Sequence, residues 1–174
     1  YSNNPAEVAM LVQQVSATGV VGVNLEDGVD HPELLAAKIA ACRSLLNGRP
    51  LFINARSDVY LRQLCTADTA ITECIRRFKL YQQAGADGAF IPGLTDLTHT
   101  TQLSQQLTLP INLMGWPEQA TLNDLTLAGV KRLSAGPALY LQTYNHYQQA
   151  CSAFLRRPET AMPAMDYARF NALF

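Results

Sequence analysis

The chain has 174 residues, of which 48% are apolar, and its formal net charge is −1. This length and composition suffice for one sizeable core, so we expect a single domain over residues 1–174, with residues 158–174 as a terminal helical tail. The near-neutral charge provides no basic field for nucleic acid or an anionic membrane surface, and no apolar stretch reaches the roughly 18 residues of a membrane span. The four cysteines form no CxxC pair, which favours free thiols in a reducing, cytoplasmic compartment.

Apolar spacing and turn residues predict helices that alternate with short strands. The expected helices are Pro5–Ala17, His31–Leu46, Ala67–Ala84, Leu94–Leu107, Thr121–Ala128, a long helix from Ala135-Gly136-Pro137 to about Leu155, and Ala164–Asn171. The expected strands are Val20–Leu25, Leu51–Ala55, Gly88–Ile91, Pro110–Met114 and Lys131–Ser134. Because strands that alternate with helices of this length are typical of βαβ units, the sequence predicts an α/β fold with a parallel sheet.

Polar side chains gather where the first two predicted strands end. Glu26 and Asp27 close the first strand, and Asn54, Arg56 and Asp58 close the second. Enzymes with parallel sheets assemble their active sites from side chains at the carboxyl ends of the strands, so these residues are candidates for a site. The alternative is that the charges are solvated loop starts.

Five motifs occur in the order and spacing of a known family. They are Gly22-Val23-Asn24-Leu25-Glu26-Asp27, Asn54-Ala55-Arg56-Ser57-Asp58, Ala84-Gly85-Ala86-Asp87-Gly88, Pro110-Ile111-Asn112-Leu113-Met114 and Gly129-Val130-Lys131-Arg132-Leu133-Ser134-Ala135-Gly136. On these motifs the chain resembles the mutase-like branch of the isocitrate lyase and phosphoenolpyruvate mutase superfamily. The resemblance implies a (β/α)8 TIM-type barrel, Mg²⁺ with Mn²⁺ as an alternative ion, a small α-keto acid or carboxylate substrate, and a homo-oligomer that exchanges a helix between paired subunits.

The same resemblance assigns catalytic roles to three residues. Glu26 resembles the acidic residue that holds the metal ion. Asp27 aligns with the second carboxylate of that motif and would hold the metal ligands in place without contacting the ion. Arg56 resembles the arginine that clamps the substrate carboxylate, for which a planar guanidinium is well suited. A structural salt bridge to Asp58 or Asp27 is the alternative role for Arg56.

Two amides complete the expected substrate site. Asn112 resembles a polar residue at a strand end near the substrate carboxylate. Asn54 flanks Arg56 together with Asp58, and both would position it.

Two departures from the family pattern limit these expectations. Tyr1 resembles the tyrosine of an Asp-x-Asp-x-Gly-Tyr-Gly-like motif, so the amino-terminal third of the barrel, with its metal-binding aspartates, is missing and the chain carries about the last five β/α units. No cysteine follows Asp27 in the next loop, which disfavours isocitrate and methylisocitrate lyase activity. His31 in that loop is a weak candidate for an acid or base.

These residues predict a Mg²⁺-dependent lyase or mutase that cleaves or forms a C–C or P–C bond through an enolate intermediate. The first alternative is a truncated, non-catalytic remnant that binds or oligomerises. The second is an open sheet that binds nucleotide, although the chain contains no glycine-rich phosphate-binding motif.

Overall fold

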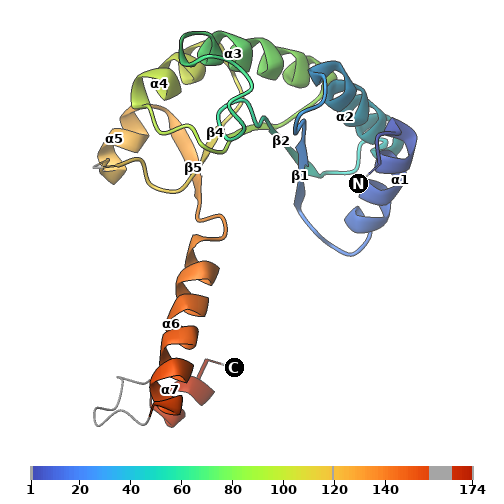
Figure 1. Cartoon of the computed structure of the whole chain (residues 1–174). Helices are drawn as coiled ribbons and strands as arrows, with labels where there is room; N and C mark the ends of the chain where they lie inside the picture. The colour runs from blue at the N-terminus through green and yellow to red at the C-terminus, as the bar shows by residue number, and fades with distance from the viewer. Residues whose placement is uncertain (1, 119, 157–165, 174) are drawn as a thin grey trace. The chain divides into compact units, whose positions relative to one another are not determined.

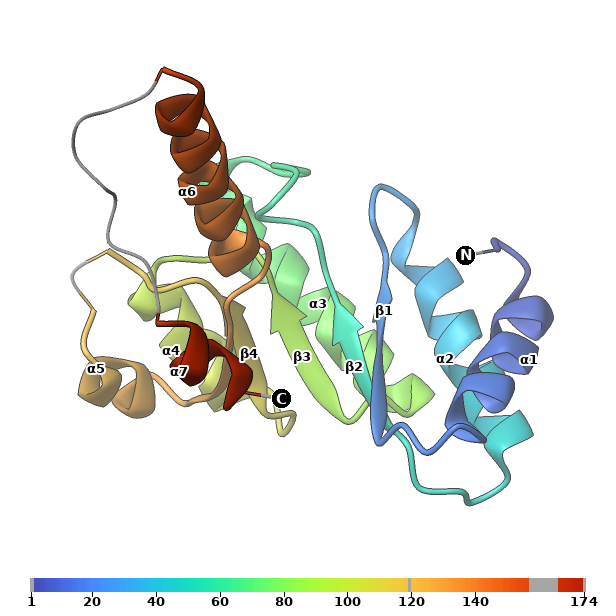
Figure 2. The same ribbon diagram turned by 90° about the horizontal axis from the view of Figure 1, so that it is seen from below.

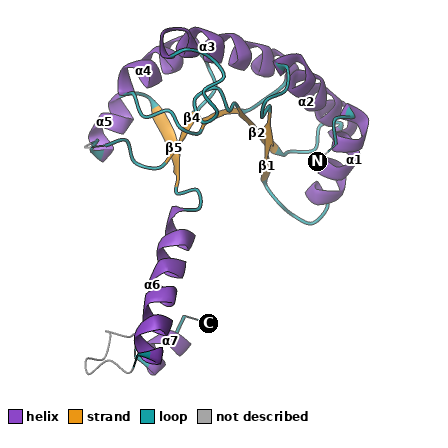
Figure 3. Ribbon diagram, viewed as in Figure 1, coloured by secondary structure: helices purple, strands orange, loops and turns teal. Residues whose placement is uncertain are grey.

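Five strands form one parallel sheet in the computed structural model, which describes residues 2–118, 120–156 and 166–173. The strands are β1 (Gly22–Glu26), β2 (Phe52–Arg56), β3 (Gly88–Ile91), β4 (Ile111–Met114) and β5 (Val130–Ser134). They lie in the order β1-β2-β3-β4-β5, and each neighbouring pair is parallel. All five predicted strands are therefore confirmed, with ends that differ by at most two residues (Figures 1 and 3).

Helices alternate with these strands and lie outside the curved sheet (Figure 1). They are α1 (Pro5–Ser16), α2 (Pro32–Leu46), α3 (Ala67–Ala84), α4 (Leu97–Gln106) and α5 (Leu122–Leu127). Asn4 caps α1 by accepting a hydrogen bond from the backbone N–H of Ala6 at 3.0 Å. The fourth predicted helix begins three residues later than expected, because the Asp96 carboxylate caps the backbone N–H groups of Thr98 and His99.

The core fills the space between the sheet and the helices. Successive side chains of a strand point to opposite faces, so Leu25, Ile53 and Ile91 pack toward the helices and are buried. The opposite, concave face carries Asn54 and Asn112 instead. Figure 2 shows β1 to β4 side by side, with helices along one side of them. One open sheet with a single helix-covered face is the arrangement of part of a barrel, as predicted.

The chain divides into two compact units, Tyr1–Ser134 and Ala135–Phe174. The second unit contains α6 (Ala138–Leu155) and α7 (Tyr167–Asn171). Residues 157–165, which include the start of the predicted tail and of its last helix, lie outside the described residues. The prediction of a single domain stays a prediction. In the part of the chain that the structure describes, no helix has the length and apolarity to cross a membrane.

Candidate functional site

Arg56 is the centre of an ion-pair cluster at the carboxyl end of β2. Its Nε and Nη2 atoms donate to the two carboxylate oxygens of Asp58, at 2.7 and 3.2 Å. Its Nη1 atom lies 3.0 Å from Oε2 of Glu26, which is opposite Arg56 on β1. The Asp58 side chain is fully buried, whereas 41% of the Glu26 side chain and 24% of the Arg56 side chain are exposed. Asp58 therefore fixes the position of the Arg56 guanidinium. Glu26 pairs with the same guanidinium and is itself partly exposed to solvent.

A second arginine, in the loop that follows β2, pairs with the same Asp58 carboxylate. Arg62 donates from Nε to Oδ2 of Asp58 at 2.9 Å, and half of its side chain is exposed. This arginine was not among the residues that the sequence singled out. Its spacing of four residues from Asp58 is a signal that could have found it, since side chains four residues apart meet in a helical turn.

Asp27 lies apart from this cluster, on the side of the sheet that faces α3. Its Oδ1 accepts the backbone N–H of Asp58 at 2.9 Å. Its Oδ2 accepts hydrogen bonds from Ser57 at 2.8 Å, Arg77 at 2.8 Å and Tyr81 at 2.7 Å. Only 3% of Asp27 is exposed. Burial, together with the Asp27 charge, raises the pKa of the Tyr81 hydroxyl. Asp27 thus joins the end of β1 to the helix layer and to the loop that holds Asp58.

A ladder of amides crosses the concave face of the sheet. Asn54 donates from Nδ2 to Oδ1 of Asn24 at 3.0 Å and to Oδ1 of Asn112 at 3.2 Å. Asn112 donates in turn to Ser134 Oγ at 3.1 Å and to the Leu113 carbonyl at 2.6 Å. Asn54 and Asn112 are 3% and 2% exposed. Both predicted amides therefore come together, but they bond mainly to each other and to their neighbours on the sheet.

Glycine at position 88 makes room for this ladder. A Cβ atom on Gly88 would lie 2.6 Å from Oδ1 of Asn54, far inside any contact distance. In the next row of the sheet, Phe90 lies beside Arg56 and opposite Asn112, and its ring centroid is 5.8 Å from the Arg56 guanidinium carbon. The aromatic face favours the cation and helps to hold it over the concave side.

The donor set at the strand ends suits a hard cation only in part. Glu26 is the solvent-accessible carboxylate in the cluster, whereas Asp27 and Asp58 are buried and hydrogen-bonded inward. No group of three or more His, Cys, Asp or Glu side chains that could hold a metal ion occurs within the described ranges. Mg²⁺ is commonly held by one or two protein carboxylates together with water and substrate oxygens. Glu26 fits one such position, and the described residues do not form a complete cage.

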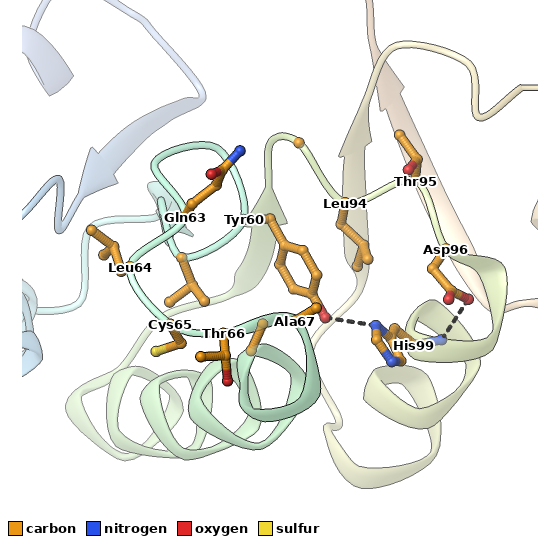
Figure 4. Close-up of a pocket in the computed structure, with 13 residues that line it drawn as sticks. Tyr60, Gln63, Leu64, Cys65, Thr66, Ala67, Leu94, Thr95, Asp96 and His99 are labelled. Atoms are coloured by element: carbon orange, nitrogen blue, oxygen red, sulfur yellow. Dashed lines mark hydrogen bonds between the residues drawn. The ribbon is translucent and has the colours of Figure 1, made fainter.

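A cavity of about 850 Å³ lies on the other side of the loop after β2, between the amino-terminal ends of α3 and α4 (Figure 4). Tyr60 and His99 point toward each other there, and the Tyr60 hydroxyl lies 2.9 Å from Nδ1 of His99. Burial raises the pKa of Tyr60. None of the predicted site residues lines this cavity. His31, the weak candidate, is exposed at the amino-terminal cap of α2, and its catalytic role stays a prediction.

Comparisons with known proteins identify related sequences. The model of the phosphoenolpyruvate phosphomutase family matches residues 1–155. An uncharacterized protein of Mycobacterium tuberculosis is 38% identical over 145 residues, which cover 80% of this chain and 52% of that protein. Oxaloacetate decarboxylase 2 of Pseudomonas putida is 29% identical over 178 residues, which cover 93% of this chain and 57% of the enzyme. The chain thus spans about half the length of these relatives.

Solved structures share the fold. A proposed phosphonomutase from Burkholderia cenocepacia J2315 matches with a TM-score of 0.77 at 33% identity, over 86% of this chain and 64% of that one. A phosphonopyruvate hydrolase, crystallised with oxalate and Mg²⁺, matches with a TM-score of 0.73 over 93% of this chain and 62% of that one. The hydrolase is 21% identical, so this second likeness concerns the fold alone.

Proposed function

Because the chain belongs to the phosphoenolpyruvate mutase and isocitrate lyase superfamily, we propose that it forms part of a lyase- or mutase-type enzyme acting on a small α-keto acid. The reaction would break or form a C–C or P–C bond next to an enolate. The observation that carries the proposal is the fixed guanidinium of Arg56 at the carboxyl end of β2, held by a fully buried carboxylate and open to solvent beside Glu26.

In this proposal, Arg56 binds and orients the carboxylate of the keto acid. A planar guanidinium pairs with a carboxylate through two parallel hydrogen bonds, which fixes direction as well as charge. Asp58 and Phe90 hold the Arg56 guanidinium in place before the substrate binds, so binding costs little side-chain entropy at Arg56. Asp27 positions Asp58 through its backbone N–H and takes no direct part.

Magnesium is the cofactor that this proposal includes, with Mn²⁺ as the alternative ion. Glu26 would hold the ion, whose chemistry when bound is to stabilise negative charge on the enolate oxygen. The amides of Asn54 and Asn112 would form the polar floor beneath the keto acid. The oxaloacetate decarboxylase among the similar proteins supports a keto acid as the substrate class.

The proposal is tested by removing the guanidinium. Arg56→Ala in the full-length protein is expected to weaken binding of 3,3-difluorooxaloacetate by about 10- to 150-fold, because a hydrogen-bonded pair to a charged group contributes about 1.5–3 kcal/mol. The measurement is isothermal titration calorimetry in the presence of Mg²⁺.

Arg49→Ala is the matched control. It removes the same side chain just before β2, at the opposite end of the strand from Arg56, and should leave the affinity unchanged. Equal affinities for the wild type and Arg56→Ala would refute the role of Arg56 as the clamp.

A further inference from the structure

We propose that Arg62 binds a second acidic group of the substrate, so that the enzyme selects keto acids with two acidic groups over keto acids with one. This inference rests on the proposed function and adds a specificity-determining residue to it. It starts from the two guanidiniums that share one buried carboxylate.

Asp58 brings the two arginines together. Its Oδ2 atom accepts from Nη2 of Arg56 at 3.2 Å and from Nε of Arg62 at 2.9 Å. Two groups bonded to the same oxygen lie close enough for one small molecule to reach both. Asp58 is fully buried, so it pairs with each arginine on the protein side of the guanidinium. Both arginine side chains remain partly exposed to solvent.

Most of the hydrogen-bonding capacity of Arg62 is available to a ligand. A guanidinium carries five N–H donors, and among the described residues only the Nε–H of Arg62 makes a hydrogen bond. Half of the side chain is exposed, so the two terminal nitrogens are accessible. Glu26 pairs with Nη1 of Arg56 and not with Arg62. Among the described residues, the charge of Arg62 is therefore balanced by the shared Asp58 alone.

The loop that carries Arg62 is anchored on several sides. The Arg62 backbone N–H donates to the Asp58 carbonyl at 2.9 Å, and Leu64 donates to the Val59 carbonyl at 3.0 Å. The Tyr60 hydroxyl meets His99 of α4 at 2.9 Å (Figure 4). These contacts fix the loop backbone that carries Arg62, as a residue that discriminates between ligands requires.

The expected ligand follows from this geometry. A carboxylate at Arg56 leaves a second fixed cation beside it, and a distal carboxylate or phosphonate can pair with that cation through the guanidinium fork. A keto acid with one acidic group cannot use Arg62. Loss of Arg62 should therefore weaken binding of the di-acid and leave the mono-acid unaffected.

The test compares two ligands that differ in the distal group, 3,3-difluorooxaloacetate and pyruvate, by titration calorimetry of the full-length protein with Mg²⁺. Arg62→Gln should weaken binding of the di-acid by about 10- to 150-fold and leave pyruvate within about twofold. Arg62→Lys should restore part of the affinity for the di-acid, since the charge returns without the fork. Arg76→Gln is the matched control, because Arg76 is also half exposed and also pairs with a nearby carboxylate, that of Glu73 on α3.

Each outcome distinguishes the inference from the proposed function. If Arg62→Gln weakens both ligands equally, Arg62 acts only by steadying Asp58 and Arg56, and the inference is wrong. If it weakens neither, Arg62 binds no acid and the inference is also wrong. If the wild-type protein binds neither ligand, the proposed function is wrong, and so is the role of Arg62.

Discussion

Asp27 and Asp58 are buried carboxylates that follow the neighbouring strands β1 and β2, and they pair with different side chains. Asp58 turns toward the concave face and holds two arginines, whereas Asp27 turns toward α3 and holds the loop. A buried carboxylate is stable only when charged or hydrogen-bonded partners replace the water it has lost. Each aspartate has such partners, and removing its charge leaves buried donors without an acceptor.

Asp27→Asn is expected to lower the free energy of unfolding by about 1–3 kcal/mol, because the buried Arg77 loses one carboxylate partner and keeps its pair with Glu73. Urea unfolding followed by circular dichroism measures this change. Glu33→Gln is the control: Glu33 is 3.5 Å from Arg76 and its side chain is 65% exposed. Its substitution should change stability by less than about 1 kcal/mol. A loss below 1 kcal/mol for Asp27→Asn would contradict the role given to this carboxylate.

The loop between β2 and α3 decides which side chains meet at the site. It crosses the end of β3 so closely that a Cβ atom at Gly93 would lie 2.9 Å from the backbone of Leu61. Gly93 also has a positive φ of +83°, which a residue with a side chain rarely adopts. Close backbone contact and loop anchoring therefore depend on glycine at this position.

Gly93→Ala is expected to destabilise the protein more than Gly28→Ala does. Both glycines have positive φ, +83° and +57°, so each substitution carries the backbone cost of about 1–2 kcal/mol. Only at Gly93 must the loop also move, which adds about 1–3 kcal/mol, since a Cβ at Gly28 would meet nothing within 4 Å. Urea unfolding of the two variants gives the difference. Equal losses would show that the loop is not packed against β3.

The unit Tyr1–Ser134, taken by itself, has one helix-covered face, one polar concave face and two edge strands. In the described sheet, β1 pairs only with β2, and β5 pairs only with β4. Unpaired strand edges are templates for association with other strands. Phe52 on the concave side is 41% exposed, which adds apolar surface to this face.

The 174 residues expressed by themselves are therefore expected to self-associate. Sedimentation velocity at several protein concentrations measures this directly. The sedimentation coefficient should rise with protein concentration, because the unpaired strand edges and the concave face of one chain can bind those of another. A single species of 19.1 kDa at all concentrations would contradict the expectation. In the full-length protein we expect these edges to be paired within the barrel, and a homo-oligomer with an exchanged helix stays a prediction.

The sequence by itself determined the elements and the candidate residues. Apolar runs bounded by glycine and proline located all five strands, since local spacing and turn chemistry leave a direct signature in the chain. Glu26, Arg56 and Asn54 became candidates because polar residues gather where the strands end, and Asn112 became a candidate through its resemblance to the family motif. The start of α4 at Leu97 was missed, because the Asp96 cap competes with apolar residues upstream that also fit a helix.

Only the tertiary structure decided what these residues face. Glu26 and Asp27 are adjacent in sequence, but a strand directs them to opposite sides, one toward Arg56 and the other toward Arg77 and Tyr81. Arg62 became a candidate only when the loop placed it on the carboxylate that already holds Arg56. Such contacts depend on strand register and on loop packing between residues far apart in the chain, and local sequence patterns contain neither.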